Sequence, residues 1–283
     1  MIDPADSRQL EAILRRHRID LRHRLGQNFL TDMTLRDSIA LATGATSEDV
    51  VVEVGAGVGT LTIALAPVCR ELIAIELDER LVEVLRETTA PHPNVHVVHE
   101  DVLRFDFRAS FPLGGEVVAG NIPYHLTGAL VRKLLDLPHR PRRLAFVVQK
   151  EVAERWTATT GASLSTVAVQ VFTSPRIALN IAARSFTPPP KVDSALVVLE
   201  VRERPAVTVD DLNRFFRLVE AVFQSRRKQL GGTLARVSGI ERAEAAERLD
   251  KLGIDPTRRP QTLTLQEWER VYGGFGGSAL VNL

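Results

Sequence analysis

The sequence predicts an α/β fold in which a mostly parallel sheet with an antiparallel edge is followed by a small all-helical domain. Between residues 49 and 150, β-branched apolar runs alternate with helix-like segments, a pattern typical of parallel strands covered by helices on both faces. The five predicted strands are DVVVEVG (49–55), ELIAIELD (71–78), VHVVHED (95–101), EVVAGNIPY (116–124) and RRLAFVVQK (142–150). Two further runs, TVAVQVFTS (166–174) and DSALVVLEV (193–201), are predicted to form the antiparallel edge.

Helices are predicted on both sides of this region. The first forty residues contain one helix over SRQLEAILRRHRI (7–19) and another that starts at about Met33. After residues 203–207, TVDD (208–211) and TLQE (264–267) have the spacing of capping boxes, and Gly253 is placed as a helix C-cap. We therefore expect residues 1–203 to form the α/β domain and residues 204–283 to form a helical domain.

Composition limits the classes of protein that fit. The 283 residues are 45% hydrophobic, so the chain can bury a large core, and its net charge of +1 excludes a uniformly basic surface. The single cysteine, Cys69, excludes a disulfide framework and a multi-cysteine zinc site, so we expect it to pack and expect no metal. No secretory signal or membrane span is recognisable, which favours a cytoplasmic protein.

A glycine loop follows the first predicted strand. Gly55, Gly57 and Gly59 would let the backbone approach a ligand, and Glu76 ends the second strand, where an acid can accept both hydroxyls of a ribose. The dinucleotide pattern requires glycine where Thr60 stands, and no Gly-Lys-Ser/Thr follows, so nicotinamide and Walker-type phosphate binding are disfavoured. S-adenosylmethionine is the remaining candidate, which predicts a Rossmann-like S-adenosylmethionine-dependent methyltransferase domain; a plain strand-to-helix turn is the alternative.

A second acid, Asp101, ends the third predicted strand in HEDVLRFDF (99–107). Parallel strands present their carboxyl ends at one edge of the sheet. A carboxylate there could accept a hydrogen bond from the exocyclic amine of the cofactor's adenine. The alternative is a solvated loop carboxylate.

Asn121 to Tyr124 interrupt the end of the fourth predicted strand. The exocyclic amine of a target adenine is a poor nucleophile until two acceptors hold its hydrogens, and it needs no strong base. The candidate acceptors are the side-chain oxygen of Asn121 and the carbonyl of Ile122, which Pro123 restricts to extended conformations. Tyr124 offers a ring face to an unstacked base. The alternatives are a simple turn, and a general-base role for His125 that this chemistry does not require.

Eight ordered stretches together resemble the ribosomal RNA adenine dimethyltransferases, most closely the bacterial small-subunit (KsgA) family. The stretches are LGQNFLTD (25–32), VVEVGAGVGTLT (51–62), IAIELD (73–78), HEDVLRFDF (99–107), GNIPYHLTG (120–128), VVQKEVAERW (147–156), SFTPPPKVDSALV (185–197) and FQSRRKQLGGTL (223–234). They extend over nearly the whole chain.

The resemblance implies a set of site residues and a substrate. The implied contacts to S-adenosylmethionine are Asn28, Leu30, Gly55, Gly57, Glu76, Asp101 and Asn121. Asn121 and Tyr124 are implied to hold the target adenine, with Phe186 as the second ring of a stack. That family dimethylates N6 of two adjacent adenosines in a hairpin loop near the 3′ end of small-subunit (16S) ribosomal RNA, and also acts late in small-subunit assembly. We expect a monomer.

Two basic clusters are candidate RNA contacts, because phosphate contacts position RNA without reading its sequence. The candidates are Arg22, Arg24, Arg226, Arg227 and Lys228, and the alternative for each cluster is a solvated face. Gly231 and Gly232 stand where the family pattern leads us to expect bulkier or polar residues, which puts the RNA contacts there in doubt.

Three other functions fit part of the sequence. An antibiotic-resistance methylase would modify an adenine of large-subunit RNA with a similar core, but PPPKVDSALV and FQSRRKQL favour the small-subunit enzyme. An assembly or transcription factor that has lost catalysis would not need Glu76 and the intact stretch from Asn121 to Tyr124. A nicotinamide oxidoreductase is disfavoured by the glycine spacing.

Overall fold

The computed structural model describes residues 2–19, 28–110, 116–123, 126–225 and 227–276. The chain divides into two compact units, Met1–Glu154 with Ser174–Val201, and Arg155–Thr173 with Arg202–Leu283. The predicted boundary between residues 203 and 204 lies two residues beyond the observed one, between Val201 and Arg202, and one earlier segment also differs. Residues 155–173 group with the C-terminal helices, because α8 (Leu164–Phe172) packs with α9 (Leu212–Phe223) and α12 (Leu265–Phe275).

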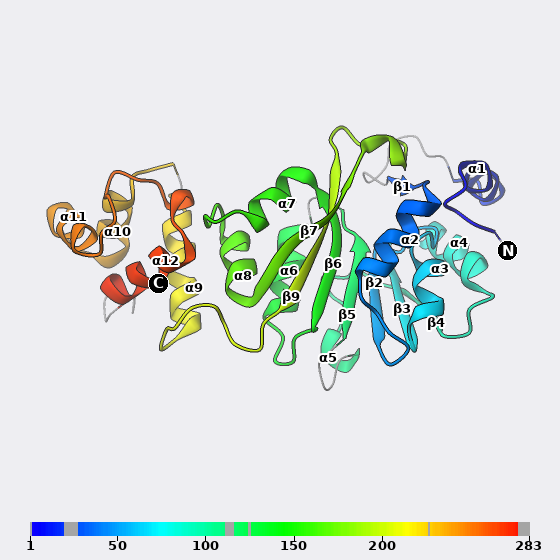
Figure 1. Ribbon diagram of the computed structural model, residues 1–283, viewed down its shortest axis with the longest axis horizontal. Coiled ribbons are helices and arrows are strands. Elements are labelled where there is room, and N and C mark those ends of the chain that lie inside the picture. Colours follow the sequence, from blue (N-terminus) through cyan, green and yellow to red (C-terminus); the bar gives the residue numbers. More distant parts are fainter. Residues whose placement is uncertain (1, 20–27, 111–115, 124–125, 226, 277–283) are drawn as a thin grey trace. The chain divides into compact units, whose positions relative to one another are not determined.

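The described part of the first unit has a seven-stranded sheet at its centre, and Figure 1 shows the strands of this sheet from one edge to the other. In spatial order its strands are β4 (Val95–His99), β3 (Glu71–Glu76), β2 (Val50–Val54), β5 (Val117–Asn121), β6 (Arg143–Gln149), β9 (Ser194–Val201) and β7 (Thr173–Ile181). The pairs from β4 to β6 are parallel, and β9 is antiparallel to β6. The predicted fold class, with its antiparallel edge, is therefore confirmed.

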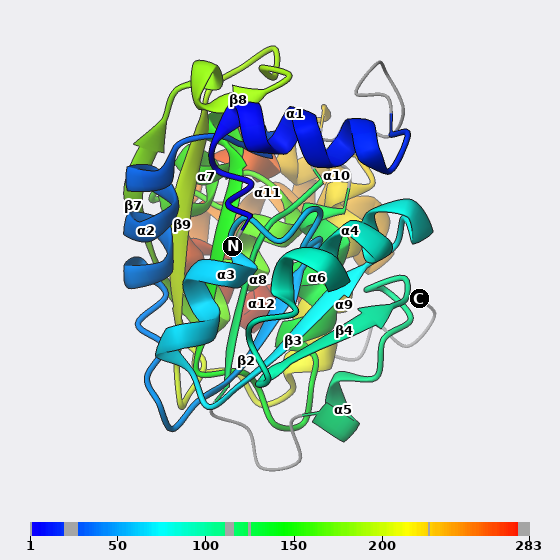
Figure 2. The same cartoon turned by 90° about the vertical axis from the view of Figure 1, so that its right-hand side faces the viewer.

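Helices cover both faces of this sheet. Figures 1 and 2 show α2 and α3 on one face and α6 on the other. The helices of this region are α1 (Ser7–Arg16), α2 (Met33–Ala42), α3 (Thr62–Leu65), η1 (Ala66–Val68), α4 (Glu79–Thr89), α5 (Phe107–Ser110), α6 (Thr127–Leu135), η2 (Ala183–Ser185) and α7 (Lys150–Thr157), which runs into the second unit. Ile39 and Leu65 are buried against Val51, Ala119 and Val147 of the sheet. Burial of such a face is the main source of stability in this architecture.

Short acidic side chains cap the N-termini of several helices, where the first backbone N–H groups have no partner within the helix. Asp32 accepts from the N–H of Leu35 at 2.9 Å, and Asp78 accepts from Arg80 at 3.1 Å. Asp78 lies two positions after Glu76, so the cap that begins α4 fixes the chain close to this acid of the predicted site.

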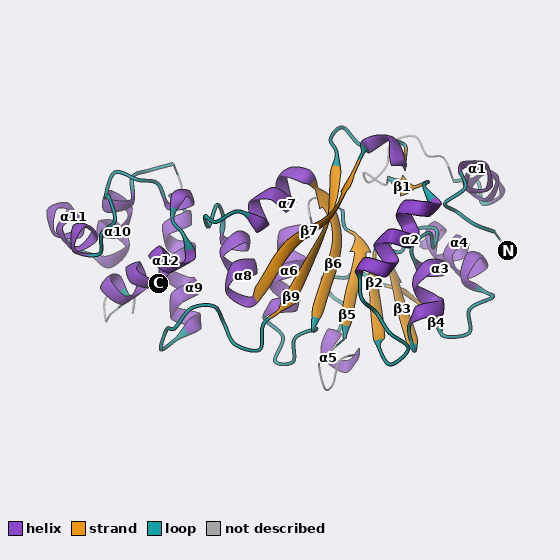
Figure 3. Ribbon diagram, in the orientation of Figure 1, coloured by secondary structure: helices purple, strands orange, loops and turns teal. Residues whose placement is uncertain are grey.

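The second unit is helical in its described part, as Figure 3 shows by colour. Its remaining elements are α8, α9, α10 (Leu230–Ser238), α11 (Arg242–Lys251), η3 (Pro260–Thr262) and α12. Aromatic contacts join these helices: the ring of Phe172 stacks on Phe216 at 5.6 Å, and the ring of Phe223 lies 5.5 Å from Trp268. None of the helices in the described part of the chain has the length and apolar run of a membrane span.

Two local predictions were wrong. The run TVAVQVFTS lies mostly in α8, capped by Ser163, and the strand β7 begins only at Thr173. A short, continuous apolar run does not distinguish a buried helix from a strand by its period. The expected capping box at 208–211 is also absent, because Asp211 is itself the N-cap of α9 and accepts from the N–H of Arg214 at 3.0 Å. The capping box at Thr264 and Glu267 is confirmed.

Candidate cofactor and catalytic site

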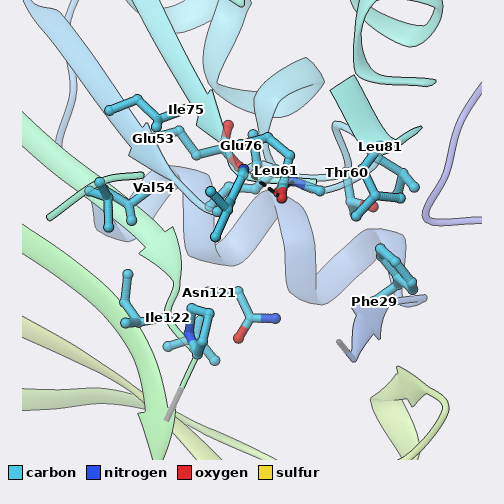
Figure 4. Close-up of a pocket in the computed structure, with 18 of the residues that line it drawn as sticks. Phe29, Glu53, Val54, Thr60, Leu61, Ile75, Glu76, Leu81, Asn121 and Ile122 are labelled. Carbon is cyan, nitrogen blue, oxygen red and sulfur yellow. Dashed lines mark hydrogen bonds between the residues drawn. The ribbon is translucent and has the colours of Figure 1, made fainter. Parts of the chain in front are cut away.

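A pocket lies at the carboxyl ends of β2, β3, β4 and β5, where the direction of the strand order reverses. Its lining includes every residue of the predicted cofactor set: Asn28, Leu30, Gly55, Gly57, Glu76, Asp101 and Asn121. Ile122, Pro123 and Phe186 line it as well. Residues separated by as many as 158 positions thus meet in one cavity, and Figure 4 shows Glu53 and Glu76 at one wall and Asn121 and Ile122 at another.

The glycine loop serves two different purposes. Gly57 has a φ of +59°, and its N–H donates to the carboxylate of Glu76 at 2.8 Å, so this backbone faces the pocket. Gly59 has a φ of +88°, and a Cβ at this position would lie 2.6 Å from the hydroxyl oxygen of Thr88 on α4. Gly59 is therefore required for helix packing, whereas the backbone at Gly57 belongs to the pocket wall.

Glu76 is buried and held by three backbone donors. One carboxylate oxygen accepts from Gly57, and the other accepts from the N–H groups of Leu77 at 2.8 Å and Asp78 at 2.9 Å. Burial raises the pKa of Glu76, and these three hydrogen bonds oppose the rise. Each carboxylate oxygen has two lone pairs, so Oε2, which among the described residues accepts only from Gly57, retains capacity to accept from a ligand hydroxyl.

The sequence reasoning missed a second buried acid, Glu53. It lines the pocket with 2% of its surface exposed, and its Oε2 atom has no hydrogen-bond partner among the described residues. Burial raises the pKa of Glu53 to about 8, the charge of Glu76 adds to the rise, and the Thr62 hydroxyl opposes it. The detectable signal was an acid in the middle of an otherwise apolar strand, VVVEV.

Asn121 is oriented by the N-terminal segment. Its side-chain nitrogen donates to the backbone carbonyl of Asn28 at 3.0 Å, and because the amide is planar, its oxygen points the other way (Figure 4). The next residue, Ile122, is 1% exposed and donates its N–H to the carbonyl of Val147 at 3.1 Å. The end of β5 is therefore fixed from both sides.

Phe186 reaches the pocket through a separate two-stranded sheet. This sheet pairs β1 (Phe29–Leu30) with β8 (Phe186–Thr187), placing Leu30 opposite Phe186. The Phe186 side chain is 3% exposed and packs in the same hydrophobic core as buried residues of α2 and of the large sheet. The structure thus brings Phe186 to the pocket wall, and its predicted stacking on a target base remains a prediction.

Several predicted residues lie outside the described part of the chain: Tyr124, His125, Arg22, Arg24 and Arg226. Arg227 and Lys228 are exposed in the turn after α9. Gly231, where we expected a bulkier or polar residue, has a packing role, because a Cβ there would lie 3.1 Å from the Cβ of Pro256. A Cβ on Gly232 would meet only the Arg242 guanidinium, at an ordinary 3.8 Å. Among the described residues, no group of three or more His, Cys, Asp or Glu side chains could hold a metal.

The strand order and the pocket define a Rossmann-like methyltransferase fold. Solved structures support this class. The 23S rRNA methyltransferase ErmE has a TM-score of 0.70 and 30% identity, covering 88% of this chain and 99% of that one. A dimethyladenosine transferase from Plasmodium falciparum has a TM-score of 0.71 and 24% identity, covering 87% and 97%, which supports the fold alone.

Sequence comparisons identify the family. The family model described as ribosomal RNA adenine dimethylase matches residues 18–272. Proteins named ribosomal RNA small subunit methyltransferase A are similar along nearly their whole length: that of Pelotomaculum thermopropionicum is 39% identical over 97% of this chain and 98% of its own. The protein of Shouchella clausii is 36% identical over 95% and 94%. The chain therefore belongs to the ribosomal RNA adenine dimethylase family and is an rRNA adenine dimethyltransferase.

Proposed function

We propose that this protein dimethylates the exocyclic N6 of two adjacent adenosines in the 3′-terminal hairpin loop of 16S rRNA, with S-adenosylmethionine as the methyl donor. We further propose that it does so as a cytoplasmic monomer on the small subunit, late in assembly. The observation that carries the proposal is the meeting of Glu76, Asp101 and Asn121 at three strand ends around one pocket. The names of the relatives add support for the small subunit as substrate.

The pocket fits the proposed cofactor. Glu76 would accept from the ribose hydroxyls, and Asp101 would accept from the adenine amine. Asn28, Leu30 and the backbone at Gly55 and Gly57 would hold the methionine end. Among the described residues, Oε2 of buried Glu53 and the hydroxyl of Thr60 have no hydrogen-bond partner, and a bound polar ligand would satisfy such groups. When bound, S-adenosylmethionine supplies an electrophilic methyl group on a sulfonium centre.

The end of β5 would prepare the target amine. The side-chain oxygen of Asn121 and the main-chain carbonyl of Ile122 would accept its two hydrogens, so that the nitrogen lone pair is released from the ring. The hydrogen bond from Asn121 to the Asn28 carbonyl supports this role, because it directs the amide oxygen, and not the nitrogen, away from the N-terminal segment. Pro123 restrains the chain, and Tyr124 with Phe186 would stack on the base. Positioning and exclusion of water would provide the catalysis.

RNA recognition is assigned to residues 204–283. The second unit contains 15 Lys and Arg against 11 Asp and Glu, whereas the first contains 21 against 24. The excess of positive charge in the second unit suits a phosphate backbone, and exposed Arg227 and Lys228 are its candidate contacts, with Arg226 beside them. Arg22 and Arg24 would add contacts from the first unit.

The decisive experiment supplies labelled S-adenosylmethionine with unmethylated small subunits, or separately with unmethylated large subunits, and maps modified nucleosides by mass spectrometry. We expect N6,N6-dimethyladenosine at two adjacent positions of the small subunit alone. Label on the large subunit alone would replace the proposal with the activity that names the similar 23S rRNA methyltransferase ErmE. Tight binding to the small subunit without label would indicate an assembly factor.

A further inference from the structure

Lys133 on α6 forms hydrogen bonds with the backbone of the segment that follows β4. Its ammonium nitrogen donates to three backbone carbonyls: those of Val102 at 3.3 Å, Leu103 at 2.7 Å and Phe105 at 2.6 Å. It also lies 5.3 Å from the centre of the Phe107 ring. An ammonium group has three hydrogens, so the loop carbonyls can account for all of its donor capacity.

The loop is a tight turn that leaves these carbonyls on one side. The Asp101 carboxylate accepts from the N–H of Leu103 at 2.9 Å. The main-chain carbonyl of Asp101 accepts from the N–H groups of Arg104 at 2.7 Å and Phe105 at 2.9 Å. Convergent carbonyl oxygens repel one another unless a cation lies between them, and an apolar side chain cannot replace that cation. Lys133 therefore stabilises one conformation of the turn that begins at Asp101.

This turn forms part of the pocket wall. Asp101 and Val102 both line the pocket, and Val102 is 5% exposed. On the other side, α6 starts directly after Leu126, another lining residue, a few positions beyond Asn121. Lys133 thus ties the wall at the end of β4 to the helix that follows the end of β5.

We propose that Lys133 is a positioning residue for recognition of the cofactor's adenine ring. By fixing the turn it holds the Asp101 carboxylate and the Val102 side chain where they meet the exocyclic amine and the face of that ring. The inference rests on the proposed function, which places adenine beside Asp101. A role in stability alone would leave the preference among bases unchanged, so base selectivity separates the two roles.

The test measures direct binding of S-adenosylmethionine, and of its analogue with hypoxanthine in place of adenine, by calorimetry without RNA. In Lys133→Met we expect the Kd for S-adenosylmethionine to rise about 10-fold, the order of one lost charge-assisted contact. The weaker Kd of the analogue, which lacks the exocyclic amine, should rise by a smaller factor. At saturating cofactor, kcat stays within about two-fold of wild type, because the acceptors at β5 are untouched. Arg132→Met, an exposed neighbour on α6, is the matched control and should match wild type.

A double-mutant cycle supplies the second readout. Because Lys133 acts through Asp101, Asp101→Asn and Lys133→Met together should weaken S-adenosylmethionine binding little more than Asp101→Asn alone. Independent, multiplicative effects would overturn the inference, as would unchanged base selectivity in Lys133→Met. If Lys133→Met does not fold, Lys133→Gln and Lys133→Arg take its place. The arginine variant should recover part of the selectivity for adenine over hypoxanthine. Wild-type selectivity in both variants would contradict the inference. A wild-type protein that fails to bind S-adenosylmethionine would instead refute the proposed function.

Discussion

The ends of β3 and β5 carry polar side chains that are held in opposite ways. Glu76 at the end of β3 has each of its oxygens engaged by backbone N–H groups. Asn121 at the end of β5 uses its nitrogen to fix itself to the Asn28 carbonyl, which directs its oxygen the other way. The first residue is immobilised through the atoms that would meet the ligand, and the second through the atom that would not.

This difference suits two different tasks. A ribose contact has the same geometry before and after methyl transfer, so an acceptor that backbone donors hold rigidly can serve it throughout. An acceptor for the reacting amine must gain strength as the nitrogen changes shape, and an oxygen without a competing backbone donor can do so. We therefore expect substitutions at β5 to affect turnover and those at β3 to affect binding.

The largest effect is expected at Asn121. Asn121→Ala removes the amide acceptor, and we expect kcat to fall by about 10²-fold or more, the order found when one preorganised polar group is lost from an active site. The Kd for S-adenosylmethionine should stay within about three-fold of wild type, since the contacts at β3 remain. Single-turnover methylation of small subunits, together with calorimetry, measures both quantities.

Asn121→Asp is the informative companion to this variant. It keeps an acceptor but loses the donor to the Asn28 carbonyl, so its turnover should lie between those of wild type and Asn121→Ala. Unchanged turnover in Asn121→Ala would remove the distinction between the two strand ends.

A smaller effect, in binding, is expected at Glu76. Glu76→Gln places an amide nitrogen among backbone donors, and loss of one charge-assisted contact should raise the Kd for S-adenosylmethionine by about 10-fold to 100-fold. Once cofactor is saturating, kcat should recover to within a few-fold of wild type. Glu79→Gln, exposed in the first turn of α4, is the control. A Glu76 variant with normal Kd and low kcat would reverse the comparison.

The smallest effect concerns stability and the acid beside Glu76. The pKa of Glu53 is raised from 4.5 to about 8, so the folded state retains a proton that the unfolded chain loses. The stability that accompanies the neutral acid is complete below pH 4.5 and is lost as the pH rises toward 8. Glu53→Gln does not titrate, so relative to wild type its free energy of unfolding should improve by about 1–3 kcal/mol between pH 5 and pH 8.

Urea unfolding at several pH values measures this prediction. Parallel pH profiles for wild type and Glu53→Gln would show that Glu53 is ionised in the folded protein. In that case the pocket would hold Glu53 as a carboxylate, and burial would not be the dominant influence on its protonation.

Much of the site could be predicted because parallel strands present their carboxyl ends at one edge. That rule alone placed Gly55, Glu76, Asp101 and Asn121 near one another, and the pocket confirms their proximity. Their roles toward a ligand remain predictions. The strand prediction for the segment that forms α8 was wrong because a short apolar run fits the period of a helix or of a strand. Packing with α9 and α12 favours the helix.

The interactions that orient the site could not be predicted from local pattern. The hydrogen bond from Asn121 reaches Asn28, 93 positions away, and Lys133 meets carbonyls about 30 positions earlier. The sequence around a helical lysine does not show whether its side chain is solvated or forms hydrogen bonds with the carbonyls of a loop. Glu53 was detectable in principle, since an acid inside an apolar strand marks a buried polar group.

The pairing of β1 with β8 has a consequence for synthesis of the chain. Leu30 is opposite Phe186, 156 positions later, so the N-terminal wall of the pocket acquires its partner strand only after that residue has been made. On a translating ribosome the exit tunnel withholds a further stretch of newly made chain. A nascent enzyme would therefore complete this site only when the sheet-bearing unit is almost wholly outside, which delays modification of RNA until the catalyst is nearly finished.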